Sequence, residues 1–200
     1  MLRGILRIRE RQGMQELAND MILYHGSYCE VREPDLRQCA RYKDFGRGFY
    51  VTTSRKQARS FAQISIRRAI ANGIANEDQN YGIVSSFRFC LDEKLSVKIY
   101  AKADAEWLHC IVGHRKMKAF SEIVRELREF DIIAGKIAND NTNATITTYM
   151  AGVFGIVGTR SADDLCIGLL LPDRLQDQFC FRTSKALNSL TFVESEQVWI

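Results

Sequence analysis

The sequence predicts an α+β fold with a largely antiparallel sheet that is curved or split. Strand-like segments are separated by single helices, without the strict alternation of strand and helix that is typical of a parallel sheet. The chain has 200 residues, of which 46% are hydrophobic and 26% are charged, as in an average globular domain with its own core. No internal repeat of about 20 to 50 residues is visible, which argues against a solenoid.

The N-terminal part divides into an appendage and the start of the main domain. Residues 1–20 have the pattern of a charged, weakly amphipathic helix, and we expect them to be an appendage to a domain that spans residues 21–200. A short apolar strand is predicted at 21–24. Two glycines on either side of Arg47 indicate a tight loop, which leads into a strand at 49–52.

The clearest predicted helix follows at once. Ser54 is a suitable N-cap, and apolar residues recur at helical spacing until Gly73, which suits the position just after a helix. Farther along, the predicted strands are 81–91, 131–138, 178–182 and 191–199, and the predicted helices are 104–112, 116–130, 145–157, 162–171 and 184–190. The polar run at 139–143 is predicted to be a loop.

Composition and motifs argue against several classes of protein. The longest apolar stretch, residues 165–171, is far shorter than the roughly 20 residues that span a bilayer, and no secretory signal is visible. The 6 cysteines form no C-x-x-C pair, and His109 and His114 have no carboxylate or cysteine at metal spacing and are assigned no function. Rossmann, P-loop, α/β-hydrolase and zincin fingerprints are absent. We therefore expect a cytoplasmic protein with reduced thiols and no metal.

Positive charge is concentrated in one stretch of the chain. The formal net charge is +4, but residues 32–72 contain 10 Lys and Arg against 3 Asp and Glu. Such a stretch can bind a phosphate-bearing ligand, either a dinucleotide or a nucleic acid, and it can equally be a solvated helix face. Arg41 and Arg47 are candidates for binding a pyrophosphate because a guanidinium group matches the geometry of phosphate oxygens.

Two side chains occupy positions where ligand sites often lie. His25 ends a short apolar strand and precedes Gly26, which puts an imidazole beside backbone that a ligand can approach closely. Tyr50 lies on the strand that the glycine turn enters. Taken singly, His25 is also compatible with a structural role, and Tyr50 with a cross-strand aromatic contact.

Read together, these segments resemble a known family. Leu-Tyr-His-Gly-Ser at 23–27, Phe-Gly-Arg-Gly-Phe-Tyr at 45–50 and Ser-Arg-Lys-Gln-Ala at 54–58 are similar to the catalytic domain of poly- and mono-ADP-ribosyltransferases of the H-Y-E class, which is diphtheria-toxin-like. An uncharacterised, toxin-like bacterial branch of this superfamily is similar also at 106–108, 131–140 and 181–187. The resemblance implies an ADP-ribosyltransferase-like fold, with a split, mostly antiparallel sheet and flanking helices.

The resemblance implies that the ligand is NAD, used as a substrate. Cleavage of the bond between nicotinamide and ribose requires a site that holds the ring flat, grips its carboxamide and stabilises an oxocarbenium-like ribose. By the family's pattern, Gly26 would hold the carboxamide through its backbone, His25 would hydrogen-bond a ribose hydroxyl, and Tyr50 would stack on the nicotinamide ring.

Three further residues belong to the site by the same resemblance. Gln57 stands where the family has a carboxamide-binding serine, and Ser27 would reach the adenosine side. Phe61, one helical turn past Gln57, is a candidate for a second aromatic wall, and its periodic position suits the core equally well.

The position of the catalytic acid departs from the family. Where the family has a glutamate at the start of a late strand, this chain has Gln178, and a neutral amide cannot stabilise positive charge as a carboxylate does. Polymer elongation should suffer most, so poly-ADP-ribosylation is not expected. Asp177 should point to the other face of the strand. Asp44 and Asp140 are each a candidate for a replacement carboxylate or for a turn cap.

We therefore expect a mono-ADP-ribosyltransferase that modifies a macromolecule, protein or nucleic acid, as an intracellular bacterial toxin of a toxin–antitoxin pair or as an effector. A cognate antitoxin protein would then exist, and residues 1–20 are a candidate docking segment for it. The alternatives are an NAD glycohydrolase, and an inactive module that binds NAD, ADP-ribose or nucleic acid. Transfer of an RNA 2′-phosphate to NAD fits the segment at 45–50 less well. No membrane partner is expected.

Overall fold

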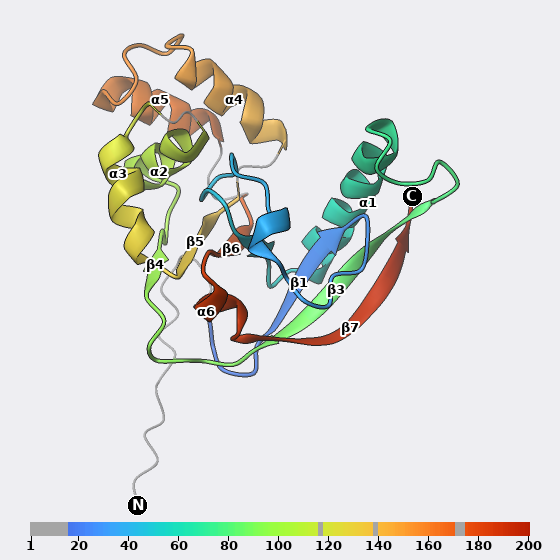
Figure 1. Ribbon diagram of the computed structural model, residues 1–200. Helices are drawn as coiled ribbons and strands as arrows, with labels where there is room; N and C mark the ends of the chain where they lie inside the picture. Colours follow the sequence, from blue (N-terminus) through green and yellow to red (C-terminus); the bar gives the residue numbers. More distant parts are fainter. Residues whose placement is uncertain (1–15, 116–117, 138–139, 171–174) are drawn as a thin grey trace, which may run out of the picture.

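Two sheets that meet along one edge form the centre of the computed structural model, which describes residues 16–115, 118–137, 140–170 and 175–200 (Figure 1). The three-stranded sheet is antiparallel and has the order β1 (Ile22–Ser27), β3 (Tyr81–Phe89) and β7 (Leu190–Trp199). The four-stranded sheet has the order β2 (Phe49–Val51), β6 (Asp177–Phe181), β5 (Ile132–Lys136) and β4 (Val97–Ile99).

An isolated antiparallel bridge between Tyr24 and Thr52 joins the two sheets. Of the pairings in the four-stranded sheet, β4 with β5 is parallel and the others are antiparallel. The predicted α+β class with a largely antiparallel, split sheet is therefore confirmed.

The helices lie at opposite ends of this arrangement. Helix α1 (Arg55–Ala71) covers β1 and β3 (Figure 1). Other helices gather beside the four-stranded sheet, namely α2 (Ala105–Arg115), α3 (Ser121–Glu126), α4 (Asp140–Met150) and α5 (Arg160–Leu170). The short elements are helix α6 (Ser184–Leu187) and the 3-10 turns η1 (Leu36–Gln38) and η2 (Leu127–Glu129).

Helix α1 begins and ends as its sequence predicts. The Ser54 hydroxyl accepts a hydrogen bond from the backbone N–H of Gln57 at 3.2 Å, as an N-cap does. Gly73 has a φ of 68°, which glycine adopts without strain just after a helix. The inward face of α1 consists mainly of small residues, including Ala58 and Ala62, so the helix axis can come close to the sheet.

Apolar residues from both sheets and from α2 form the core. Trp107, Leu108 and Ile111 of α2 are completely buried against Phe45 and the four-stranded sheet. All 6 cysteines are free thiols, and Cys110, Cys166 and Cys180 are buried. Burial raises the pKa of Cys110 and Cys180 to about 12, so both behave as small hydrophobic residues, as expected.

The predicted N-terminal helix at 1–20 lies mostly outside the described residues, and the part that is described is not helical. Asp20 has a φ of 63° in a turn, and its backbone N–H donates to the carbonyl oxygen of Phe89 at 2.9 Å. Leu17 packs against the core beside β1. This contact with the domain, rather than helical periodicity, fixes residues 16–20.

The loop predicted at 139–143 is wrong over residues 140–143, because α4 begins at Asp140. Thr142, Ile146 and Tyr149 are buried and recur at helical spacing, so tertiary packing outweighs the low helix propensity of this polar run. The helix predicted at 145–157 ends at Met150, and Gly152 follows with a φ of 78°.

Two further elements differ from the prediction. The helix predicted at 116–130 begins only at Ser121, because Phe120 takes a left-handed conformation with a φ of 52° and stacks on the His109 ring. Strand β4 is absent from the predicted elements, since the apolar–polar–apolar alternation of Val97, Lys98 and Ile99 covers only three residues, which is too short to predict a strand. It forms by pairing with β5.

Candidate functional site

His25 is bonded to the backbone of the strand that carries Tyr50. Its Nδ1 lies 2.7 Å from the carbonyl oxygen of Tyr50, and its ring centroid is 4.4 Å from that of Phe49. A carbonyl oxygen only accepts, so Nδ1 carries the proton and Nε2 of the neutral ring is left as an acceptor. Burial lowers the pKa of His25, against the opposing effect of this hydrogen bond. His25 is therefore suited to accept a hydrogen bond from a hydroxyl group.

Gly26 is explained by the packing of α1. A Cβ atom at this position would lie 2.1 Å from the carbonyl oxygen of Ala58 and 2.8 Å from the nitrogen of Ala62. Gly82 on β3 is in the same situation, 2.3 Å from the carbonyl oxygen of Ala62. The two glycines let α1 cross the sheet at close range, and the carboxamide contact predicted for Gly26 stays a prediction.

Tyr50 uses its hydroxyl to hold the turn that precedes it. The hydroxyl donates to the carbonyl oxygen of Gly46 at 2.7 Å and accepts from the N–H of Phe45 at 2.9 Å. Burial raises the pKa of the Tyr50 phenol well above its usual range, which keeps it protonated as this donor. With the hydroxyl engaged, the half-buried ring is the part of Tyr50 that a ligand can contact.

Gln178 lies on the same face of the four-stranded sheet as Tyr50. Tyr50 pairs with Cys180 in the antiparallel register, and Gln178 is two residues before Cys180 on β6, so the three side chains share one face. Gln178 is 5% exposed, and its Nε2 donates to Oδ2 of Asp44 at 2.9 Å. The candidate carboxylate Asp44 is therefore in contact with Gln178.

Asp44 is in turn paired with Arg115 from the end of α2. Nε and Nη2 of Arg115 both donate to Oδ1 of Asp44, the first at 3.1 Å, and Nη1 donates to Oδ1 of Asn143 on α4 at 2.7 Å. Both members of the ion pair are largely buried, with side-chain exposures of 14% for Arg115 and 10% for Asp44. The charge of Asp44 is thus balanced by an ion pair.

Asp177 lies apart from this cluster. Asp177 points to the opposite face of β6, as predicted, and is paired with Nζ of Lys136 at 2.7 Å. Asp140 begins α4, and its side chain is outside what the structure describes.

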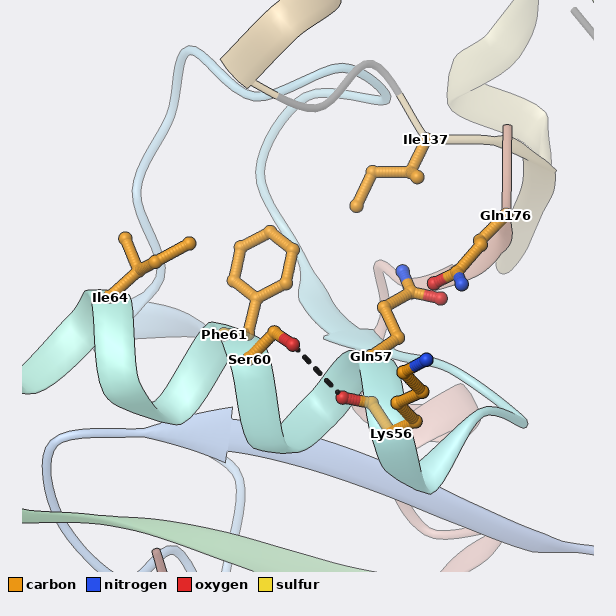
Figure 2. Close-up of a pocket in the computed structure, with 7 residues that line it drawn as sticks. All are labelled: Lys56, Gln57, Ser60, Phe61, Ile64, Ile137 and Gln176. Carbon is orange, nitrogen blue, oxygen red and sulfur yellow. Dashed lines mark hydrogen bonds between the residues drawn. The ribbon is translucent and has the colours of Figure 1, made fainter. Parts of the chain in front are cut away.

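A pocket of about 250 Å³ lies between α1 and the adjacent ends of β5 and β6 (Figure 2). Gln57 and Phe61, both predicted site residues, project from α1 toward Ile137 and Gln176. Phe61 is 39% exposed, so it forms a wall of this pocket and does not belong to the core. The full lining consists of Lys56, Gln57, Ser60, Phe61, Ile64, Ile137 and Gln176.

The orientation of the Gln57 amide is fixed by Thr52. The Thr52 hydroxyl accepts from the N–H of Ser54 at 3.1 Å and donates to Oε1 of Gln57 at 2.9 Å. Because Oε1 is engaged, Nε2 of Gln57 is the group left as a donor. Thr52 follows Tyr50 by two residues, so this bond connects the pocket to the strand that carries Tyr50.

The segments that carry the predicted site residues thus approach the pocket from two sides. On one side, His25 is bonded to Tyr50, and Thr52 is bonded to Gln57. On the other side, the backbone carbonyl oxygen of Gln176 accepts a hydrogen bond from the N–H of Ile137 at 2.7 Å. Gln176 lines the pocket and lies two residues before Gln178. His25, Tyr50 and Gln178 are not themselves among the lining residues.

Three predicted binding residues lie apart from the pocket lining. Ser27 has its hydroxyl 4.0 Å from the Cys29 sulfur. Arg47 is exposed and donates from Nε to the carbonyl oxygen of Leu36 at 2.6 Å. Arg41 is also exposed. Their predicted contacts with the adenosine and pyrophosphate groups stay predictions.

Sequence reasoning missed a buried cluster around His109. Nε2 of His109 lies 2.7 Å from Oδ2 of Asp163, whose other oxygen accepts from the hydroxyl of Tyr149. The pair is 54 residues apart, which sequence spacing cannot reveal. Phe120 stacks on the imidazole with ring centroids 4.1 Å apart. Among the described residues, no group of three or more metal-ligating side chains is placed to hold an ion.

Comparison with known proteins identifies a family. A model described as a protein of unknown function, DUF3990, matches residues 21–192, and no curated protein matches the chain. Over the part of the chain that the structure describes, no helix is long and apolar enough to cross a membrane. The matched range contains both strands with His25 and Tyr50, the pocket helix α1 and Gln178. Because the match covers most of the chain, the protein belongs to the DUF3990 family.

Proposed function

We propose that this protein binds NAD at the α1 pocket and transfers mono-ADP-ribose to a macromolecule. The observation that carries the proposal is the placement of Gln57 and Phe61 in one pocket, with Gln57 bonded to the strand of Tyr50. The sequence resemblance assigns these residues to the nicotinamide end of the ligand. The ADP-ribosyltransferase-like fold is part of the same proposal, and the split sheet with α1 beside β1 agrees with it.

The dimensions of the pocket favour one half of a dinucleotide. At about 250 Å³, it is slightly smaller than the roughly 300 Å³ at which small-molecule sites begin. Phe61 and Ile64 offer apolar surface to a flat ring, and Nε2 of Gln57 is available to donate to a carboxamide oxygen. The nicotinamide end would enter the pocket and reach past its lining toward Tyr50 and His25, and the adenosine half would extend along the surface.

The neighbouring residues are suited to the chemistry of bond cleavage. The acceptor Nε2 of His25 would bind a ribose hydroxyl, and the ring of Tyr50 would stack against the leaving nicotinamide. Gln178 is neutral and Asp44 is ion-paired, so the site carries little net negative charge to stabilise an oxocarbenium-like ribose. This arrangement favours the transfer of a single ADP-ribose over rapid polymer elongation. It is also compatible with hydrolysis of NAD, which is the second candidate reaction.

The test is incubation of the purified full chain with labelled NAD and a bacterial lysate. Free nicotinamide and label on macromolecules are both followed, for the wild type and for Tyr50→Ala and Phe61→Ala. Ile74→Ala, which removes a side chain that is 62% exposed just after α1, is the matched control. We expect nicotinamide release and labelled product from the wild type and the control, and a large loss in both site variants.

Other outcomes separate the alternatives. Nicotinamide release without label would indicate an NAD glycohydrolase. Absence of release, combined with NAD binding, would indicate an inactive binding module. Tight binding of nucleic acid that falls steeply with salt would indicate instead that residues 32–72 contact phosphates.

The proposal extends to the role of the protein in the cell. An enzyme that modifies macromolecules inside its own producer requires a neutralising partner, so we propose a toxin with a cognate antitoxin protein and residues 1–20 as the docking segment. Removal of residues 1–20 tests the docking role. Unchanged affinity for the partner after this truncation would contradict it.

A further inference from the structure

The amide of Gln178 is held in one orientation by Asp44. Its Nε2 donates to Oδ2 of Asp44 at 2.9 Å, with a second, longer contact of 3.5 Å to the carbonyl oxygen of Lys136. An ionised carboxylate only accepts hydrogen bonds, so the NH₂ group of the amide must face Asp44. No residue that the structure describes donates to Oε1 of Gln178. The amide therefore keeps an acceptor oxygen for another group.

Asp44 is held in place by Arg115 and by the turn that follows it in the chain. Arg115 binds its Oδ1, and Arg115 is in turn held by Asn143 on α4. The turn that follows Asp44 is held by the hydroxyl of Tyr50. The position of the Gln178 amide thus depends on contacts that reach from the helical end of the molecule to the sheet.

The residue type at position 178 depends on the carboxylate at position 44. A glutamate at position 178 would bring a second carboxylate against Asp44 within a largely buried site, where the guanidinium of Arg115 already pairs with the first. Two carboxylates in contact cannot both ionise without a large cost. A neutral glutamine at position 178 therefore fits beside the ion-paired Asp44 better than a glutamate would.

We propose that Asp44 is a positioning residue, which holds Gln178 so that its Oε1 accepts a hydrogen bond from a ribose hydroxyl of the ligand. This inference rests on the proposed function, since it takes the ligand to be NAD. Asp44 acts through Gln178 and does not touch the ligand. Arg115 pairs with Asp44 and holds it in place.

The test is a reversal of hydrogen-bond polarity in the full chain. In the double variant Asp44→Asn with Gln178→Glu, the introduced amide oxygen can accept from Arg115 and the introduced amide nitrogen can donate to the new carboxylate, so the shape and total charge of the cluster are kept. Each single variant breaks the pairing. Asp177→Asn, which removes an ion-paired carboxylate from the opposite face of the same strand, is the matched control.

Unfolding measurements test the pairing without any ligand. We expect both single variants to unfold at lower urea concentration than the wild type, and the double variant to recover most of the loss. For Gln178→Glu, the deficit should grow as the pH rises above 5, because a carboxyl with a raised pKa keeps its proton in the folded state after the unfolded chain has lost it. Additive effects of the two changes would contradict the pairing.

Turnover of NAD tests the positioning role. Asp44→Asn should lower kcat by about tenfold or more with a smaller change in KM. The double variant should restore kcat, because the carboxylate that Gln178→Glu introduces is held by the new amide and can again accept from the ribose hydroxyl. A fully active Asp44→Asn protein would overturn the positioning role, even if the unfolding data show the pairing. A wild type that releases no nicotinamide would instead contradict the proposed function, and the unfolding data would still report on the pair.

Discussion

The imidazole Nδ1 of His25 lies 2.7 Å from the carbonyl oxygen of Tyr50, so one hydrogen bond joins the two residues that the sequence singles out. Because the bond involves the backbone of Tyr50, it is independent of the tyrosine side chain. It fixes the tautomer of the histidine and presents Nε2 as an acceptor. The same strand then continues to Thr52, which orients Gln57 in the pocket.

The protein should lose stability as the pH falls below about 6.5. Burial lowers the pKa of His25 and of His114 in the folded state, so the unfolded chain takes up protons that the folded chain does not. This stabilisation is complete above the unfolded pKa and is lost progressively below it. Urea unfolding at pH 7.5 and 5.5 measures the effect. His25→Asn, whose amide can still donate to the Tyr50 carbonyl, should reduce the pH dependence, and an unchanged dependence would contradict the burial of a neutral His25.

Gly26→Ala should be strongly destabilising, by about 2 kcal/mol or more, since its Cβ would lie 2.1 Å from the backbone oxygen of Ala58. Gly168→Ala is the control, because it stands in α5 with no atom near its Cβ position. That change should be neutral or stabilising by up to about 1 kcal/mol. Thermal unfolding of the two variants compares them. Equal effects would show that α1 does not cross β1 as closely as described.

Tyr50→Phe should separate the two roles of Tyr50. The variant keeps the aromatic ring but loses the hydrogen bonds to Phe45 and Gly46, which should cost about 1 to 3 kcal/mol of stability because the turn groups lose their partner. NAD turnover in the folded variant should be retained far better than in Tyr50→Ala. Equal loss of turnover in both folded variants would show that the hydroxyl, and not the ring, is what the site needs.

Asp131→Asn should lower the free energy of unfolding at pH 7 by about 2 kcal/mol. Burial alone would raise the pKa of Asp131, but hydrogen bonds from Thr183, Ser96 and Lys185 outweigh it and lower the pKa to about 2. The ionised form is therefore the stabilising one above the unfolded pKa, and its contribution is lost as the pH falls through the folded value. The difference between variant and wild type should shrink between about pH 4 and pH 2. A difference that does not change with pH would rule out this cause.

Local patterns in the sequence predict much of the sheet and α1. The Ser54 cap, the periodic alanines and Gly73 act within one segment, so they can be read without knowledge of the rest of the fold. Helix α4 could not be predicted in the same way. Its start at Asp140 depends on burial of Thr142 and Ile146 against other elements, which a polar run does not reveal.

The candidate site shows the same division. Sequence motifs point to His25, Tyr50 and Gln57, and the structure connects these residues through β2. The ion pair of Asp44 with Arg115 joins residues 71 positions apart and has no local signal. Its existence depends on where the end of α2 packs, so it could be found only in three dimensions.

The most direct test of the account is whether NAD binds at the α1 pocket. The thermal unfolding temperature of the full chain should rise with NAD concentration, since a ligand that binds only the folded state stabilises it. Phe61→Ala should abolish this rise, and Ile74→Ala should leave it intact. A wild type whose unfolding temperature does not respond to NAD, or a Phe61→Ala variant that responds as fully as the wild type, would contradict NAD binding at this pocket.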